Sequence, residues 1–186
     1  MKKIILIISL FLIGIFNVYA SVNIEKGSLI NVKFNKCIDG DTASFIYKNE
    51  RIKVRFLAIN TPEIGNNEEE YGRKASNYTC DKLKQAKVIK LEFDKKSNIK
   101  DKYDRYLAWV FVDDTLLQKE LIKESLAKTA YLYDEYKYTK ELQELEEEIK
   151  KQNKNIWSNT NNSKNYDYLY IVPILLILLL IVLLKK

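Results

Sequence analysis

The chain has 186 residues, a formal net charge of +6 and no histidine, and it is long enough for one folded domain between two apolar ends. The absence of histidine excludes hydrolases that depend on it, zinc sites that contain it and a histidine general base. Only two cysteines are present, Cys37 and Cys80, which excludes a zinc site built from cysteines and leaves catalytic groups that suit hard-cation chemistry.

Residues 1–20 predict a secretory signal peptide. Two lysines precede an apolar stretch, and small residues near Ala20 offer a cleavage point. An uncleaved anchor or a buried helix is the alternative. In an oxidising compartment Cys37 and Cys80 could form a disulfide, and two free buried thiols remain an open alternative.

Residues 21–158 are expected to form one domain of the α+β class. Alternating apolar residues predict strands at 29–34, 43–47 and 52–56, with a turn at Lys48-Asn49-Glu50. The elements that follow are a helix over about 69–85, strands over 88–93 and 106–112, a turn at Asp113-Asp114, and helices over 116–126 and 136–151. This order is compatible with a small barrel flanked by helices, as in an OB-fold, and other α+β arrangements fit it as well.

Residues 168–184 predict a transmembrane helix. Helical periodicity is lost from Asn153 on, and residues 159–167 read as a polar linker. The apolar stretch carries no charge and ends in two lysines, and tyrosines at its start fit the membrane interface. Lysines on the outer side of both apolar ends place the domain on the far side of the membrane, so we expect it to be extracellular or periplasmic. Because these lysines contribute to the net charge, that charge is only a weak indication of a nucleic-acid partner.

Three short motifs carry chemistry, and the first is Asp39-Gly40-Asp41. It places two carboxylates two residues apart, with a glycine between them that permits a tight turn. Such a turn can direct a carboxylate at a hard cation, and an ordinary Asp-Gly hairpin turn is the alternative.

The second motif runs from Arg55 on a predicted strand through the loop Asn60-Thr61-Pro62 to Glu63. An arginine that binds phosphate, a loop that supplies metal oxygens and a glutamate that accepts a proton from water suit phosphodiester cleavage. The alternative is a surface arginine followed by a helix start that Thr61 caps.

The third motif, residues 101–108, precedes a predicted strand. It offers three side chains that donate hydrogen bonds to phosphate, namely Lys102, Tyr103 and Arg105. A solvated hairpin loop is the alternative.

Taken together and in this order, the motifs resemble the staphylococcal nuclease (thermonuclease) family over about Val32 to Trp157. The similarity includes Tyr71-Gly72 with Ala75, the run 126–133 and the closing residues 155–158. The resemblance implies a five-stranded OB-fold β-barrel with about three flanking helices. It also implies a Ca²⁺-dependent nuclease that cleaves DNA and RNA, preferably single-stranded or denatured, with little sequence specificity and no obligate protein partner.

Carried over by position, the resemblance implies a role for ten residues. Those that would act in catalysis are Arg55, Glu63 and Arg105. Those that would bind Ca²⁺ are Asp41, Asn60 and Thr61, the last through its backbone carbonyl. Those that would contact the substrate are Lys102, Tyr103, Tyr131 and Tyr133.

Two positions depart from the family pattern, which has aspartate in place of Asn60 and glycine in place of Asp104. Asn60 removes one negative charge from the cation site, and Asp104 adds a carboxylate between two cationic residues. A catalytically weak or inactive OB-fold module that binds single-stranded nucleic acid or a partner is therefore the alternative function.

Overall fold

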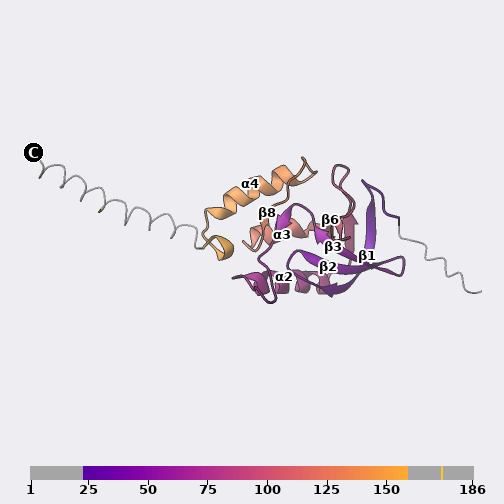
Figure 1. The fold of residues 1–186 in the computed structure, drawn as a ribbon, viewed down its shortest axis with the longest axis horizontal. Coiled ribbons are helices and arrows are strands. Elements are labelled where there is room, and N and C mark those ends of the chain that lie inside the picture. Colours follow the sequence, from indigo (N-terminus) through magenta and orange to yellow (C-terminus); the bar gives the residue numbers. More distant parts are fainter. Residues whose placement is uncertain (1–22, 159–172, 174–186) are drawn as a thin grey trace, which may run out of the picture.

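The computed structural model describes residues 23–158 and Pro173 (Figure 1). The predicted signal peptide and the polar linker lie outside these residues, as does the predicted transmembrane helix apart from Pro173. Within residues 23–158, no helix is both long enough and apolar enough to cross a membrane.

Five strands close into a barrel, which confirms the predicted fold. An antiparallel meander is followed by two further antiparallel strands, and a parallel pairing of β3 with β6 closes the circle. The five strands are β1 (Leu29–Cys37), β2 (Thr42–Tyr47), β3 (Glu50–Phe56), β5 (Ile89–Glu92) and β6 (Tyr106–Val112). Three two-residue strands add to them, namely β4 (Ile59–Asn60), β7 (Thr115–Leu116) and β8 (Lys128–Thr129).

Both predicted hairpin turns are confirmed. Lys48 and Asn49 have φ angles of 49° and 66°, and Asp113 and Asp114 have φ angles of 47° and 67°. Two consecutive left-handed residues match the right-handed twist of the strands they connect, so these short polar turns fix the register of the strands on either side.

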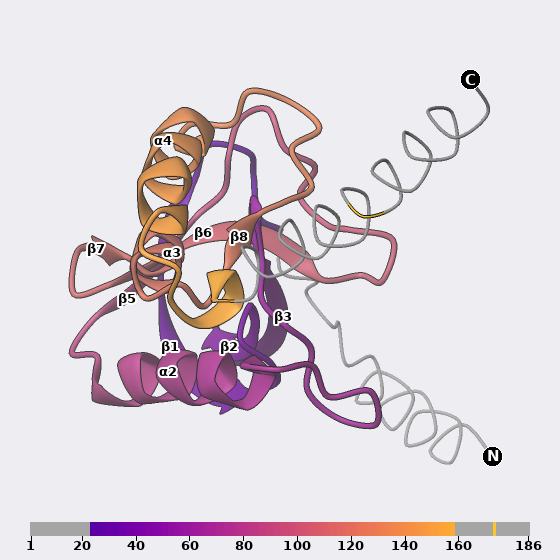
Figure 2. The ribbon, with the colours of Figure 1, turned by 90° about the vertical axis from the view of Figure 1, so that its left-hand side faces the viewer.

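Three helices flank the barrel: α2 (Gly72–Gln85), α3 (Leu117–Lys123) and α4 (Thr139–Lys150). In Figure 2, α2 runs beneath β1 and β2, while α4 lies beside α3 on another side of the barrel. The helix predicted from residue 69 begins at Gly72, because Tyr71 is left-handed, with φ 68°. The helix predicted to end at residue 126 ends at Lys123, shortly before the left-handed Ser125.

The polar residues after Asn153 still belong to the folded domain. A short 3₁₀ helix, η1 (Asn155–Trp157), packs back on the loop after α3. The Ile156 N–H donates to the carbonyl of Ser125 at 3.3 Å, and the Asn155 side-chain amide donates to the carbonyl of Glu124 at 2.7 Å. Loss of helical periodicity therefore marks the end of α4 and not the end of the fold.

A buried carboxylate, Asp94, joins the core to the segment before α4. Its two oxygens accept hydrogen bonds from the indole of Trp109 (3.0 Å) and the backbone N–H groups of Lys96 and Lys137 (both 2.8 Å). Burial alone would raise the pKa of Asp94, but the hydrogen bonds from these groups outweigh it and hold the pKa below its usual range.

We expect Asp94→Asn to lower the free energy of unfolding at pH 7 by about 1–3 kcal/mol, because an amide offers one acceptor oxygen to three donors. The contribution of Asp94 is fully present above the unfolded-state pKa of about 3.9 and is lost as the pH falls through the lower folded-state pKa. Urea unfolding from pH 7 to pH 3 should therefore show a flatter acid limb in the variant. The exposed Asp114→Asn serves as the control, and equal acid limbs in wild type and Asp94→Asn would contradict the assignment.

Candidate active site

The turn between β1 and β2 is clamped to helix α2. The Thr79 hydroxyl donates to the carbonyl of Gly40 at 2.5 Å, and a disulfide joins Cys37 to Cys80 with a Cα–Cα distance of 5.7 Å. A Cβ added at Gly40 would lie 2.6–2.9 Å from the side chain of Thr61 and 3.0 Å from the Cβ of Ala75. Only glycine fits there, so the turn that carries Asp39 and Asp41 has its position set by α2.

Asp41 is buried and forms an ion pair with Arg55. Its Oδ2 lies 3.0 Å from Arg55 Nη2 and accepts the Thr61 N–H at 2.9 Å, while Oδ1 accepts the Thr42 hydroxyl at 3.0 Å. Burial raises the pKa of Asp41, and the Arg55 charge and these hydrogen bonds counter only part of the rise. The pair joins the acidic turn to strand β3.

Both terminal nitrogens of Arg55 donate hydrogen bonds to oxygens of the protein. Nη1 donates to the carbonyls of Phe56 and Ile59 at 3.2 and 3.0 Å, and Nη2 donates to Asn60 Oδ1 at 3.0 Å besides pairing with Asp41. Forked binding of a phosphate, which the sequence suggests for Arg55, would require some of these contacts to open.

Both polar atoms of the Asn60 side chain are hydrogen-bonded within the protein. Its Oδ1 accepts from Arg55, and its Nδ2 donates to the carbonyl of Thr61 at 3.1 Å. Two oxygens that were expected to bind a cation, Asn60 Oδ1 and the Thr61 carbonyl oxygen, therefore accept hydrogen bonds within the protein.

The donor set nevertheless suits a hard divalent cation. Thr61 Oγ1 is buried without a hydrogen-bond partner among the described residues, although it lies close enough to Asp41 to favour the ionised carboxylate. Residues 23–158 contain no group of three or more acidic, cysteine or histidine side chains that could hold a metal ion. A cation here would therefore need hydroxyl, amide or backbone oxygens beside Asp41, and Ca²⁺ accepts such neutral ligands.

Asp39 and Glu63 form a second carboxylate pair beside Asp41. Burial, a hydrogen bond to Glu63 and the charges of Asp41 and Glu63 raise the pKa of Asp39 to about 7, against the opposing hydrogen bond from the Gly40 N–H. The sequence indicates Asp39 only as one member of an acidic turn. Its contact with Glu63 arises because the fold brings two distant loops together.

Gly72 fixes the loop that carries Glu63. A Cβ at Gly72 would lie 2.2 Å from the carbonyl oxygen of Glu63, so no larger residue fits at the start of α2. Glu69 adds two contacts, because its carboxylate accepts the Glu63 N–H at 2.9 Å and its own N–H donates to the Glu63 carbonyl at 3.0 Å. Sequence reasoning noted Gly72 as a family position without this role.

In the parallel pairing of β3 with β6, Arg55 lies opposite Leu107. Arg105 precedes Leu107 by two residues, so we expect its side chain to leave the same face of the sheet as that of Arg55. Arg105 Nε donates to Asp101 Oδ2 at 2.6 Å, which holds Arg105 against its own loop. Burial opposes ionisation of Asp101, but hydrogen bonds from Arg105 and Tyr103 lower its pKa. The side chain of Asp104 pairs with Lys100 at 2.7 Å. The left-handed φ of 61° at Asp104 is typical of a glycine position.

Three exposed tyrosines border these arginines. Tyr131 and Tyr133, which are 56% and 83% exposed, have ring centroids 6.5 Å apart, and Tyr131 lies 5.5 Å from the Arg55 guanidinium. Pairing of β8 with β4 brings this segment beside Asn60. Tyr103 is 66% exposed and lies 5.0 Å from the Lys102 ammonium and 5.3 Å from the Arg105 guanidinium.

The fold thus brings most of the sequence-predicted residues into direct contact. Asp41, Arg55, Asn60, Thr61 and Tyr131 form one continuous cluster, and Glu63 adjoins it through Asp39. The residues Lys102, Tyr103 and Arg105 form a second group on the loop before β6, held together around Tyr103.

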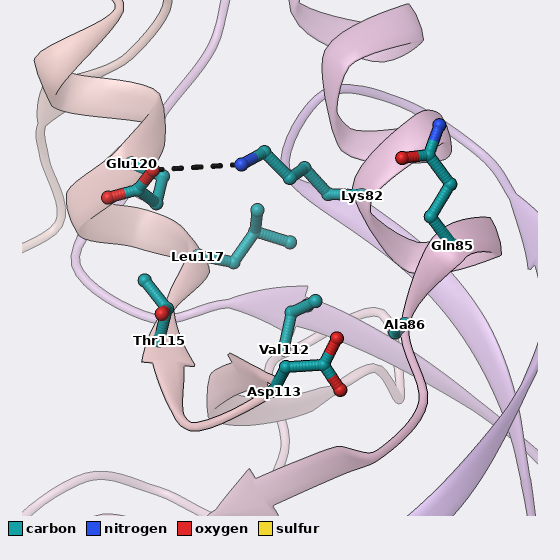
Figure 3. Close-up of a pocket in the computed structure, with 8 residues that line it drawn as sticks. All are labelled: Lys82, Gln85, Ala86, Val112, Asp113, Thr115, Leu117 and Glu120. Atoms are coloured by element: carbon teal, nitrogen blue, oxygen red, sulfur yellow. Dashed lines mark ion pairs between the residues drawn. The ribbon is translucent and has the colours of Figure 1, made fainter.

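A hollow of about 310 Å³ lies elsewhere, between α2, α3 and the turn after β6 (Figure 3). Lys82 and Glu120 face each other across it at 3.7 Å, and none of the sequence-predicted site residues lines it. The candidate site itself combines buried polar side chains, Asp41, Arg55 and Thr61, with exposed tyrosines.

Comparison with known proteins points to one family. Residues 53–159 match the family described as staphylococcal nuclease homologue. Endonuclease YncB of Bacillus subtilis is 38% identical over 138 residues, which are 72% of this chain and 64% of that protein. The SPbeta prophage-derived endonuclease YokF of the same organism is 37% identical over 134 residues, or 70% of this chain and 45% of that protein.

Thermonuclease of Staphylococcus hyicus is 31% identical over 144 residues, which are 76% of this chain and 83% of that protein. This chain therefore spans most of the staphylococcal relative but less than two thirds of the two Bacillus proteins.

We expect the double variant Cys37→Ser, Cys80→Ser to be less stable than wild type by about 2–4 kcal/mol, because the disulfide closes a loop with a sequence separation of 43 residues in the unfolded chain. Urea unfolding measures the difference. Wild type treated with a dithiol reductant should match the variant, and the variant itself should not respond to reductant. Coincident unfolding curves for oxidised wild type and variant would contradict a stabilising disulfide.

Proposed function

This chain belongs to the staphylococcal nuclease family, and on that premise we propose that it is a Ca²⁺-dependent nuclease that hydrolyses phosphodiester bonds of DNA or RNA with little sequence specificity. The observation that carries the proposal is the buried ion pair of Asp41 with Arg55, beside a turn whose Asp39 carboxyl interacts with Glu63. Carboxylates and arginines are the groups that hydrolysis of a phosphodiester needs when no histidine is available.

In this proposal Glu63 is the general base. It accepts a proton from the water whose oxygen attacks phosphorus, while the bond from phosphorus to the leaving sugar oxygen breaks and that oxygen takes up a proton from solvent water. Burial and the neighbouring carboxylates raise the pKa of Asp39 to about 7, so part of the population is protonated at neutral pH and can donate a hydrogen bond to Glu63.

The residues that would hold Ca²⁺ are Asp41, the Thr61 carbonyl and Asn60, once the Asn60 amide releases its present partners. When bound, Ca²⁺ would neutralise charge on the phosphate oxygens and so favour attack by water. Arg55 and Arg105 would stabilise the charge that develops on the same oxygens.

Exposed tyrosines supply the contacts to bases. Tyr131 and Tyr133 present their rings to solvent beside Arg55, and Tyr103 does so beside Arg105. Aromatic rings stack on any base, so they support binding without sequence preference and favour a single-stranded or denatured substrate. Lys102 and Tyr103 would contact a neighbouring phosphate.

We place the domain outside the cytoplasm, anchored by residues 168–184. Support comes from the signal-peptide pattern, from the lysines that flank both apolar ends and from the disulfide between Cys37 and Cys80, a bond that oxidising compartments maintain. Extracellular Ca²⁺ modules work with dissociation constants of about 10⁻⁴–10⁻³ M, which a site with few carboxylates can reach.

The test is cleavage of denatured DNA and of RNA by the full-length chain, with Ca²⁺ or with a chelator. Cleavage should require Ca²⁺, and Glu63→Gln should lower kcat by about 10²–10⁴-fold, the usual contribution of a general base. Glu144→Gln on the exposed face of α4 is the matched control. Undiminished cleavage by Glu63→Gln would refute the role of Glu63. Binding of single-stranded DNA without cleavage by wild type would favour the alternative, a module that binds nucleic acid only.

Asn60→Asp should move half-activation by Ca²⁺ to lower concentration by roughly fivefold or more, since a unit charge about 4 Å away contributes about 1 kcal/mol even in water. The change also removes the amide donor from the Thr61 carbonyl, which leaves that oxygen available to the cation. Asn31→Asp, an exposed change of equal charge on β1, is the control. An unchanged or higher midpoint for Asn60→Asp would remove residue 60 from the cation site.

A further inference from the structure

The outer face of the β1–β2–β3 sheet carries four exposed cations, Lys33, Lys36, Arg51 and Lys53, which we name the cationic face. Ile52 is buried in the core, so its neighbours on β3 point outward. The strand registers place Lys33, Ile46 and Arg51 in one row across the sheet, and Lys36, Ser44 and Lys53 in the next.

The charge of this face is not neutralised by the domain. Among residues 23–158, none of the four side chains takes part in an ion pair. Lysines on the helices are different: Lys119 of α3 pairs with Glu141 and Lys150 of α4 with Glu147. Glu50, the acidic residue of β3, is two residues from Ile52 and so lies on the same side of the strand as Ile52, opposite to the cationic face.

The cationic face leads into the candidate site. Arg51, Lys53 and Arg55 alternate along β3, so their side chains leave the same side of the sheet at intervals of about 6.6–6.8 Å. This line of side chains along β3 ends at Arg55, which pairs with Asp41 and contacts the ring of Tyr131. Lys33 and Lys36 lie on β1, two strands from β3 and therefore about 9–10 Å from it.

We propose that the cationic face binds the sugar–phosphate backbone of a single-stranded polynucleotide and extends the substrate site from Arg55 toward the β2–β3 turn. This rests on the proposed nuclease function and adds a substrate class, namely long strands in preference to short oligonucleotides. Lysine and arginine contacts to phosphate are independent of sequence, in keeping with bases that are held only by the tyrosines.

An anionic membrane surface is the competing partner for such a face. Helices that bind membrane surfaces combine cations with large apolar residues that enter the lipid. Here the two rows across the sheet include one large apolar side chain, Ile46, and the polar Ser44 accepts a hydrogen bond of 3.1 Å from the Asn35 amide. A polar, ordered surface in line with Arg55 favours a polynucleotide.

The experiment uses the full-length chain carrying Glu63→Gln, so that binding is measured without cleavage. The test variant adds Lys33→Gln, Arg51→Gln and Lys53→Gln. The control variant instead adds Lys84→Gln, Lys87→Gln and Lys151→Gln, three exposed changes of equal charge on and after the helices. The probes are a labelled oligothymidylate of about 30 nucleotides and a dinucleotide, titrated with Ca²⁺ over a range of salt concentrations.

At about 0.1 M salt the test variant should bind the long probe about 10- to 100-fold more weakly, and its salt slope should fall by about 2, the value expected for three lost phosphate contacts to a single strand. The ratio of long-probe to dinucleotide affinity should fall with it, and the control should keep the wild-type ratio. An equal loss for both probes, or an equal loss in the control, would overturn the proposal.

Two further outcomes separate this inference from the function on which it rests. If the chain with Glu63 intact cleaves DNA but the test variant binds the long probe normally, the cationic face fails and the nuclease function stands. If the chain cleaves nothing but the test variant loses long-probe affinity, the nuclease function fails and the binding face stands. A third outcome is that the test variant loses the preference for anionic vesicles over neutral vesicles while its long-probe affinity stays unchanged. That result would overturn the proposal in favour of a membrane contact.

Discussion

The buried ion pair between Asp41 and Arg55 is the contact on which the rest of the site depends. It joins the turn after β1 to strand β3, and the same guanidinium reaches the carbonyl of Ile59 and the side chain of Asn60. Burying two charges is costly unless each is paired and hydrogen-bonded, and here both are. The barrel end and the candidate site therefore share one set of contacts.

Around this pair, the site holds more negative than positive charge. Burial and the charges of Asp41 and Glu63 together raise the pKa of Asp39 to about 7. A divalent cation bound nearby would relieve this repulsion and lower the pKa of Asp39, so binding of the proposed Ca²⁺ and protonation of Asp39 would oppose each other. Asn60 limits the crowding, because an amide in place of a carboxylate adds no charge and bonds to both Arg55 and Thr61.

Helix α2 positions this charged cluster from below. Its first residue, Gly72, touches the backbone of Glu63, while Ala75, Thr79 and Cys80 hold the turn that contains Gly40. One rigid element thus sets the distance between the two carboxylate loops. Precise spacing of this kind is what a hydrolytic site requires, since a misplacement of about 1 Å is enough to reduce catalysis strongly.

The sequence by itself determined the five strands, the two hairpin turns and the three helices, because alternation and helical spacing follow directly from which side of each element is buried. It also indicated the residue types of the site through the Asp-Gly-Asp turn and the segment from Arg55 to Glu63. Helix starts were less certain: α2 begins at Gly72 because of the left-handed Tyr71, a backbone state that the apolar pattern does not encode.

Only the tertiary structure decided how these residues meet. The disulfide between Cys37 and Cys80 and the contact between Asp39 and Glu63 join segments that the chain separates by many residues, and no local pattern specifies such distances. The orientation of Asn60 toward Arg55 depends on competition among several hydrogen-bond partners. Likewise, the cationic face exists because the strand registers align charges from β1 and β3, which in the sequence are separate lysines and arginines with no visible relation.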